Sequence, residues 1–225
     1  MQDCRNPYNS SRWKRFRKSF LFDNPRCIMC LAMGRQESAT EVDHVIPWGG
    51  NHELFWNNEF NALCKSCHSE KTYYETVKSG LLPNNIRVGS KDVTFLIGSP
   101  CSGKTTWAKK QGKKVIDLDD IKRDVSGQDP WQMDIKYLST CLAVRNRLIE
   151  RTKEPVIIIS TMSSRKIIDN WSRKLKTKVT WMCTTQRKCL QWLKQSDRPN
   201  KRGIASLINR WYDEYIPSGK EVYVR

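Results

Sequence analysis

The sequence predicts two units of different fold class, a small α+β unit followed by an α/β unit whose parallel sheet is covered by helices. Three observations predict this. Two Cys-x-x-Cys pairs lie in the first 80 residues, and short apolar stretches alternate with helical stretches after residue 92. Between them, LLPNNIRVGS is rich in turn formers and has no helical or strand period. We therefore expect domains at 1–80 and 93–225, joined by a linker at 81–92.

Composition narrows the class of partner. The chain has 225 residues, enough for two domains with separate cores, and a formal net charge of +17. Most of the excess lies in the second half. Lys and Arg neutralise phosphates with release of counterions, so we expect nucleic acid as the partner, DNA before RNA; a solvated basic surface is the alternative.

The N-terminus and the cysteines indicate the compartment. MQDCRNPYNS lacks the apolar core of a signal peptide, and no apolar run approaches the roughly 18 residues of a membrane span. We therefore expect a cytoplasmic protein that does not contact a membrane. In a reducing compartment, nine cysteines argue for a metal site and against a disulfide framework.

The elements expected in the first unit are two helices and a strand. RWKRFRK, from residue 12, begins a basic helix with Trp13, Phe16 and Phe20 on one side. EVDHVIPW, residues 41–48, alternates like a strand and meets a turn directly after Asp43-His44. KTYYETVKSG reads as a helix that Gly80 ends.

The cysteine pairs predict a zinc site. Cys27, Cys30, Cys64 and Cys67 offer four thiolates from two tight turns, which is the spacing of tetrahedral zinc ligation. Such a closed site stabilises structure and leaves no open position for chemistry.

Acidic and imidazole side chains lie beside these cysteines. Asp43-His44 lies between the two pairs, and His68 directly follows Cys67. If the second pair begins a helix, His68 projects from its first turn towards Asp43. These two side chains then share a divalent cation, and His44 stays free to take a proton from water; a structural role near the zinc is the alternative.

Residues 8–74 resemble the HNH endonuclease family in its zinc-stapled phage form, at YNSSRWKRFRKSFL, NPRCIMC, ATEVDHVIP, ELFWNN and ALCKSCHSEKT. The resemblance implies a ββα-metal fold, Asp43 and His68 as ligands of Mg²⁺ or another divalent cation, and His44 as general base. The family's middle asparagine falls at Glu59 here. We assign its role to Asn61, with Asn58 as the alternative.

The second unit shows the pattern of a parallel sheet. Strands are expected at 92–98, 113–118, 155–161 and 178–184, with EVYVR as an edge strand. Within 131–151, apolar residues recur at helical spacing. Alternation of strands and helices is typical of a parallel sheet covered on both sides.

GSPCSGKT, residues 98–105, is a Walker A pattern between a predicted strand and a predicted helix. Its backbone amides would wrap the phosphates of ATP, Lys104 would reach the β and γ oxygens, and Thr105 would bind Mg²⁺. The nucleotide-binding residues expected are Gly98, Ser99, Ser102, Gly103, Lys104 and Thr105.

The residues after the other strands favour a phosphotransferase. PVIIIST ends in Ser160 and Thr161, where motor and switch NTPases carry an acidic residue. VIDLDDIKRD offers Asp117, Asp119 and Asp120 after the second strand, where loops of a parallel sheet meet the ligand. Capping the following helix is the alternative role for one of these aspartates, and we expect it of Asp120.

Residues 93–215 resemble the P-loop kinase family that includes the polynucleotide 5′-kinase of T-even phages, most clearly at GSPCSGKTTWA and DLDDIKRD. The resemblance implies Asp119 as general base, Lys122 and Arg123 as acceptor-binding residues, and Arg198 as the lid arginine on the transferring phosphoryl group. The two resemblances together imply a bifunctional phage-type nuclease and kinase. The alternatives are an ATP-dependent accessory nuclease of DNA packaging with a phage protein partner, and a non-enzymatic zinc module fused to a nucleotide sensor.

Overall fold

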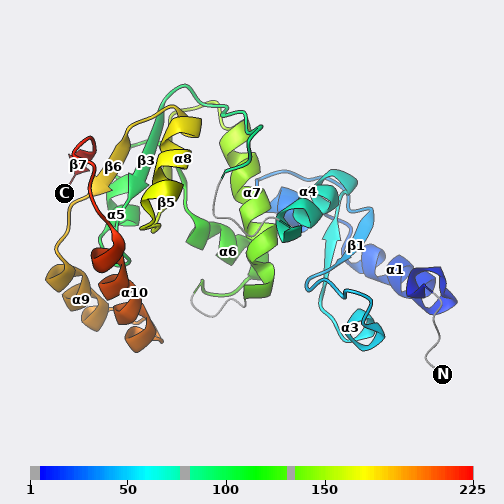
Figure 1. Cartoon of the computed structure of the whole chain (residues 1–225). Helices are drawn as coiled ribbons and strands as arrows, with labels where there is room; N and C mark the ends of the chain where they lie inside the picture. Colours follow the sequence, from blue (N-terminus) through cyan, green and yellow to red (C-terminus); the bar gives the residue numbers. More distant parts are fainter. Residues whose placement is uncertain (1–5, 77–81, 131–134, 225) are drawn as a thin grey trace. The chain divides into compact units, whose positions relative to one another are not determined.

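The computed structural model describes residues 6–76, 82–130 and 135–224, and the chain forms two compact units (Figure 1). The first unit holds the described residues up to 76 together with 122–128 and 135–144. The second holds 82–121, 129–130 and 145–224. Gly80, the predicted end of a helix, lies outside the described residues, and the predicted linker boundaries stay predictions.

The first unit contains the predicted strand, which pairs with a second strand in a hairpin, and the predicted helix after the last cysteine. Strand β1 (Glu41–His44) pairs antiparallel with β2 (Phe60–Leu63), and α4 (Lys65–Thr76) packs on both strands. The register places Asp43 opposite Asn61. The other helices of residues 6–76 are η1 (Pro7–Asn9), α1 (Ser11–Asp23), α2 (Ile28–Leu31) and α3 (His52–Trp56).

An aromatic core supports this unit. Ser10 caps α1 by accepting a hydrogen bond from the Trp13 amide at 3.1 Å. The predicted face of Trp13, Phe16 and Phe20 packs into a cluster with buried Phe55. Each aromatic ring removes roughly 150–250 Å² from water, so a few rings give a small unit much of its hydrophobic stabilisation.

The second unit confirms the predicted parallel sheet. Its five strands are all parallel, in the order β4-β5-β3-β6-β7. They are β3 (Val93–Ile97), β4 (Lys114–Ile116), β5 (Val156–Ser160), β6 (Val179–Met182) and the edge strand β7 (Val222–Val224).

Helices cover both faces of this sheet. On β3, Leu96 belongs to a buried cluster with Ala108 of α5 (Lys104–Lys109), whereas Phe95 stacks on Trp171 of α8 (Arg165–Leu175), with ring centroids 5.5 Å apart. Successive side chains of a strand point to opposite faces, which explains the continuous apolar run that a doubly covered strand needs.

The remaining helices follow the alternation of the sequence. They are α6 (Leu118–Ser126), η2 (Ile135–Tyr137), α7 (Leu138–Arg151), α9 (Gln186–Gln195) and α10 (Lys201–Glu214). The helix predicted within 131–151 is therefore present as α7, and residues 131–134 lie outside the described ranges. Among the described helices, none is long and apolar enough to cross a membrane.

Candidate functional site

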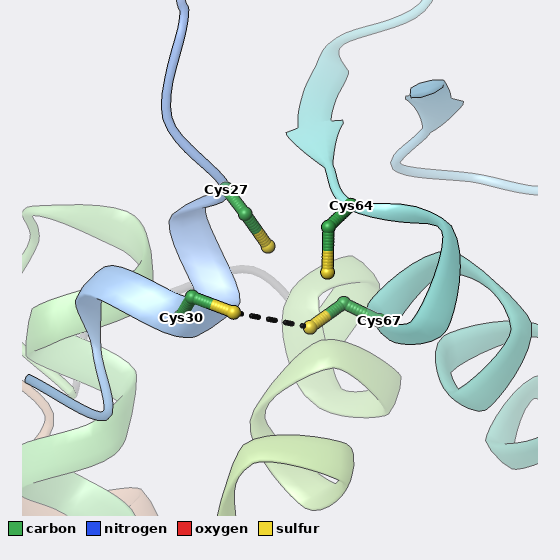
Figure 2. A group of neighbouring side chains, drawn as sticks. All are labelled: Cys27, Cys30, Cys64 and Cys67. Atoms are coloured by element: carbon green, nitrogen blue, oxygen red, sulfur yellow. Dashed lines mark hydrogen bonds between the residues drawn. The ribbon is translucent and has the colours of Figure 1, made fainter. Parts of the chain in front are cut away.

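The four predicted cysteines converge, with their sulfur atoms pointing towards one another (Figure 2). All four Sγ atoms lie within 4.8 Å of one another. The sulfurs of Cys30 and Cys67 are 3.6 Å apart. This matches the edge of about 3.8 Å in a tetrahedron with metal–sulfur distances of about 2.3 Å, and it is too long for a disulfide bond of about 2.05 Å. The cluster therefore fits one zinc ion.

Tight turns at two helix starts position these sulfurs. The Leu31 amide donates to the Cys27 carbonyl at 3.0 Å, and the His68 amide donates to the Cys64 carbonyl at 3.0 Å. Burial raises the pKa of the Cys30 thiol. A bound cation would supply the positive charge that keeps such buried thiols deprotonated.

Asp43 and His68 lie together, at the end of β1 and on the first turn of α4. Asp43 Oδ1 is 3.5 Å from His68 Nε2, and the carboxylate is buried while the imidazole is partly exposed. Two ligands at about 2.1 Å from one ion are about 3.0–3.4 Å apart, so the pair fits a shared divalent cation. The protein would supply two ligands, leaving the other positions to water or substrate.

Lys71, which the sequence interpretation missed, is fully buried in the same site. Its ammonium lies 2.9 Å from Asp43 Oδ2, donates to the His44 carbonyl at 2.9 Å, and pairs with Glu75. Burial raises the pKa of Asp43, and the positive charge of Lys71 partly offsets this. Lys71 follows His68 by three residues on α4 and so lies on the same helix face. The spacing of three residues from His68 could therefore have indicated Lys71 as a member of the site.

His44 differs from the expected imidazole open to water, because its side chain is only 6% exposed. The ring stacks on Trp13, with centroids 5.6 Å apart and planes 5° apart. Its Nε2 lies 3.2 Å from the Phe55 carbonyl, and the Tyr8 hydroxyl lies 3.4 Å from its Nδ1. Burial lowers the pKa of His44 below its usual value, which favours the neutral form that a base requires. The role of His44 as general base stays a prediction.

Asn58 orients the loop after β1. Its amide donates to the carbonyls of Ile46 at 2.8 Å and Leu54 at 3.1 Å, and its oxygen accepts from the Ile46 amide at 3.2 Å. Asn61 instead lies opposite Asp43 on β2, buried, with its Nδ2 atom unpaired. The hydrogen bonds across the loop are thus made by Asn58, the alternative residue, because Asn61 shares a face of the hairpin with Asp43.

The predicted phosphate-binding residues form the turn from β3 to α5. Gly103 precedes α5 with a φ of +89°, a left-handed conformation that favours glycine. Lys104 is buried, and its ammonium donates to the carbonyls of Gly98 at 2.9 Å and Ser99 at 2.7 Å. Burial lowers its pKa to about 8. Ser102, also buried, lies 3.4 Å from the ammonium through its hydroxyl.

Asp117 connects this loop to the end of β4. The Thr105 hydroxyl donates to Asp117 Oδ2 at 2.8 Å, and the Asp119 amide donates to Asp117 Oδ1 at 3.1 Å. Asp117 therefore caps α6, and the expectation that Asp120 does so is wrong, because α6 begins at Leu118, directly after Asp117. Burial raises the pKa of Asp117.

The other predicted kinase residues lie on α6 and in the loop between α9 and α10. Lys122 and Arg123 follow Asp119 by one turn on α6. Arg198 lies in the loop and donates through Nη1 to the Cys101 sulfur at 2.9 Å. Arg198 thus contacts the P-loop at Cys101, and its role as a lid arginine stays a prediction.

A pocket of about 830 Å³ opens beside the P-loop. Trp107 and Lys110 of α5, Thr184 after β6, and Lys188 and Trp192 of α9 are among its lining residues. Its size and its mixture of aromatic and hydroxyl groups suit a small polar ligand with a flat ring.

A parallel sheet with a Gly-Lys-Thr loop between a strand and a helix defines the second unit as a P-loop nucleotide-binding domain. The chain belongs to the AAA domain family, whose model matches residues 93–210, slightly more than half of the chain. The model of the HNH endonuclease family matches residues 27–73, which include the four cysteines, Asp43, His44 and His68. No curated protein is significantly similar to the chain.

Proposed function

We propose that the chain is a bifunctional nucleic-acid processing enzyme of phage type, a metal-dependent HNH endonuclease joined to an ATP-dependent polynucleotide 5′-hydroxyl kinase. The observation that carries the proposal is the buried Asp43 beside His68 and His44, within the region that matches the HNH model. The net charge of +17 favours a polymeric substrate, because a kinase for mononucleotides needs only a small positive pocket.

In the nuclease, Asp43 and His68 hold the divalent cation, and the four cysteines hold a structural zinc ion. When bound, the divalent cation would neutralise phosphate charge and stabilise the leaving oxygen. His44 receives the proton of the attacking water. Asn58 holds the loop after β1 by its bonds to Ile46 and Leu54.

In the kinase, the nucleobase of ATP enters the pocket between Trp107 and Trp192, and the P-loop amides with Lys104 bind its phosphates. Thr105 and Asp117 are the residues that would hold Mg²⁺, since they already share a hydrogen bond. We assign the 5′-hydroxyl acceptor to Asp119, on the first turn of α6.

The transfer step uses residues around that acceptor. Asp119, on the first turn of α6, takes the proton of the 5′-hydroxyl, and Lys122 and Arg123 bind the acceptor phosphate. Arg198 stabilises the charge that spreads over the transferring phosphoryl group. Strand β5, next to β3, ends at Ser160, which supports transfer to a hydroxyl over motor-type hydrolysis.

The nuclease assignment predicts that His44→Ala lowers metal-dependent cleavage of DNA by about 10²–10⁴-fold, the usual contribution of a general base. Cleavage of plasmid and of single-stranded DNA and RNA with added Mg²⁺ or Mn²⁺ measures this. His52→Ala, at another histidine of the same unit, is the matched control. Full cleavage by His44→Ala would identify a contaminant. Absence of cleavage by the parent protein would favour the non-enzymatic zinc module.

The kinase assignment predicts that Asp119→Asn lowers phosphate transfer from ATP to 5′-hydroxyl oligonucleotides by about 10²–10⁴-fold and leaves ATP binding intact, because the base acts only on the acceptor. Labelled γ-phosphate on DNA ends measures transfer. Lys104→Ala is expected to lose both phosphate transfer and ATP binding. Asp213→Asn, at an exposed residue, is the control and should keep both. ATP hydrolysis stimulated by DNA, with no labelled ends, would contradict the kinase and favour the packaging accessory.

A further inference from the structure

A directed chain of hydrogen bonds runs through His44. The carbonyl of Phe55 can only accept, so His44 Nε2 carries the proton in the 3.2 Å contact between them. The lone pair of the ring is therefore on Nδ1. The Tyr8 hydroxyl lies 3.4 Å from Nδ1 and accepts a hydrogen bond from Trp48 Nε1 at 3.1 Å, which leaves its own proton directed at His44.

Tyr8 covers the only basic atom of the imidazole. His44 is 6% exposed, whereas Tyr8 is 38% exposed. Solvent thus reaches residue Tyr8 more readily than residue His44. The one nitrogen of His44 that can accept a proton lies against the Tyr8 hydroxyl.

The position of Tyr8 is fixed by its surroundings. Asn6 caps the short helix η1 by accepting from the Tyr8 amide at 3.1 Å. The Tyr8 ring makes edge contacts with Trp13 and Phe55, with centroids 5.3 Å and 4.9 Å apart. Tyr8 is thus held through its backbone by the cap and through its side chain by two rings and an indole N–H, which fixes its hydroxyl beside His44.

We propose that Tyr8 is a catalytic residue of the nuclease, whose hydroxyl passes the proton of the attacking water to His44. The proposal rests on the proposed nuclease function and adds a residue to it. His44 remains the final proton acceptor, and Tyr8 is the group that touches the water.

The proton transfers balance as follows. An O–H bond of the water breaks as its proton moves to the Tyr8 oxygen, and the Tyr8 O–H bond breaks as that proton moves to His44 Nδ1. Tyr8 stays neutral, His44 becomes an imidazolium, and the resulting hydroxide attacks phosphorus. The P–O bond to the leaving oxygen then breaks. The imidazolium returns its proton through Tyr8 to solvent or to the leaving oxygen.

Tyr8→Phe tests this proposal because it removes one oxygen and keeps the ring contacts. We expect single-turnover cleavage to slow by about 10²-fold, within the range of acid–base contributions, with an unchanged KM and melting temperature. Tyr73→Phe, at an exposed tyrosine of α4, is the matched control and should cleave like the parent. A Tyr8→Phe rate equal to the parent's, or faster, overturns the proposal; a faster rate would show that the hydroxyl only blocks His44.

Trp48→Phe supplies a second test, since it removes the N–H that orients the Tyr8 hydroxyl. Trp48→Phe alone should slow cleavage less than Tyr8→Phe, and adding it to Tyr8→Phe should cause no further loss, because both act through one hydroxyl. If the rate losses of the two single variants instead multiply in the double variant, the two residues act independently, which would contradict the relay.

A measurement that does not depend on cleavage tests the hydrogen bond between Tyr8 and His44 separately from the relay. The chain has 3 histidines, so ¹⁵N-histidine labelling gives few ring signals. The Nδ1 resonance of His44 should move towards that of an unbonded nitrogen in Tyr8→Phe. An unmoved resonance overturns the hydrogen bond itself.

If the parent cleaves and His44→Ala does not, but Tyr8→Phe cleaves normally, the relay fails and the nuclease stands. If the parent never cleaves, both fail.

Discussion

Cys67→Ser is expected to unfold the first unit while the P-loop unit keeps its sheet. The four sulfurs lie within 4.8 Å of one another and join α2 to the start of α4. Structural zinc sites of this kind contribute about 10–16 kcal/mol of apparent binding free energy at pH 7. A unit of this size, whose aromatic core lies around Trp13 and Phe55, has little stability to offset such a loss.

Two measurements on the full chain check this. Zinc content should fall from one ion per chain in the parent to well below one in Cys67→Ser, and amide exchange in β1 and β2 should lose its protection. Exchange in β3 and β5 should not change. Cys183→Ser, at a half-buried cysteine of the P-loop unit, is the matched control and should keep the zinc. Protected β1 and β2 amides in a zinc-free Cys67→Ser protein would contradict a structural metal.

The parts of the site that follow from local sequence were predictable. Two Cys-x-x-Cys turns can converge on one point, and a histidine after the last cysteine falls on the first turn of the helix, which is why His68 meets Asp43. The P-loop was equally predictable from the sequence, because its strand, glycines, Lys104 and helix are continuous in the chain. The β3 to β7 sheet followed from apolar stretches separated by helices.

Contacts between distant segments were not predictable from these patterns. Tyr8 and His44 meet only because η1 packs over the hairpin, across 36 residues of chain. The hydrogen bonds of Asn58 likewise join separate segments, because they reach Ile46 across 12 residues of chain, whereas Asn61 lies within β2 opposite Asp43. The burial of Lys71 was not predictable either, because a lysine usually lies at the surface unless its ammonium is paired with carboxylates.

Lys71→Met is expected to lower the local free energy of unfolding of the β1–β2 hairpin by about 3–5 kcal/mol, the cost of removing one partner from a buried ion pair. Methionine keeps most of the methylene packing. The loss therefore comes from Asp43, which is buried, and Glu75, which is largely covered, once neither has its shared cation. The carbonyl of His44 also loses a hydrogen bond. Amide exchange in β1 and β2 of the zinc-loaded chain measures the change.

Two further variants decide whether charge causes this loss. Lys65→Met, at the exposed first residue of the same helix, should stay within about 0.5 kcal/mol of the parent, as surface changes usually do. Lys71→Met combined with Asp43→Asn should be more stable than Lys71→Met alone, because the amide removes the uncompensated negative charge. If the two losses instead add, Lys71 acts by filling space. Recovery in the double variant would mean that its ammonium balances the same carboxylate to which we assign the divalent cation.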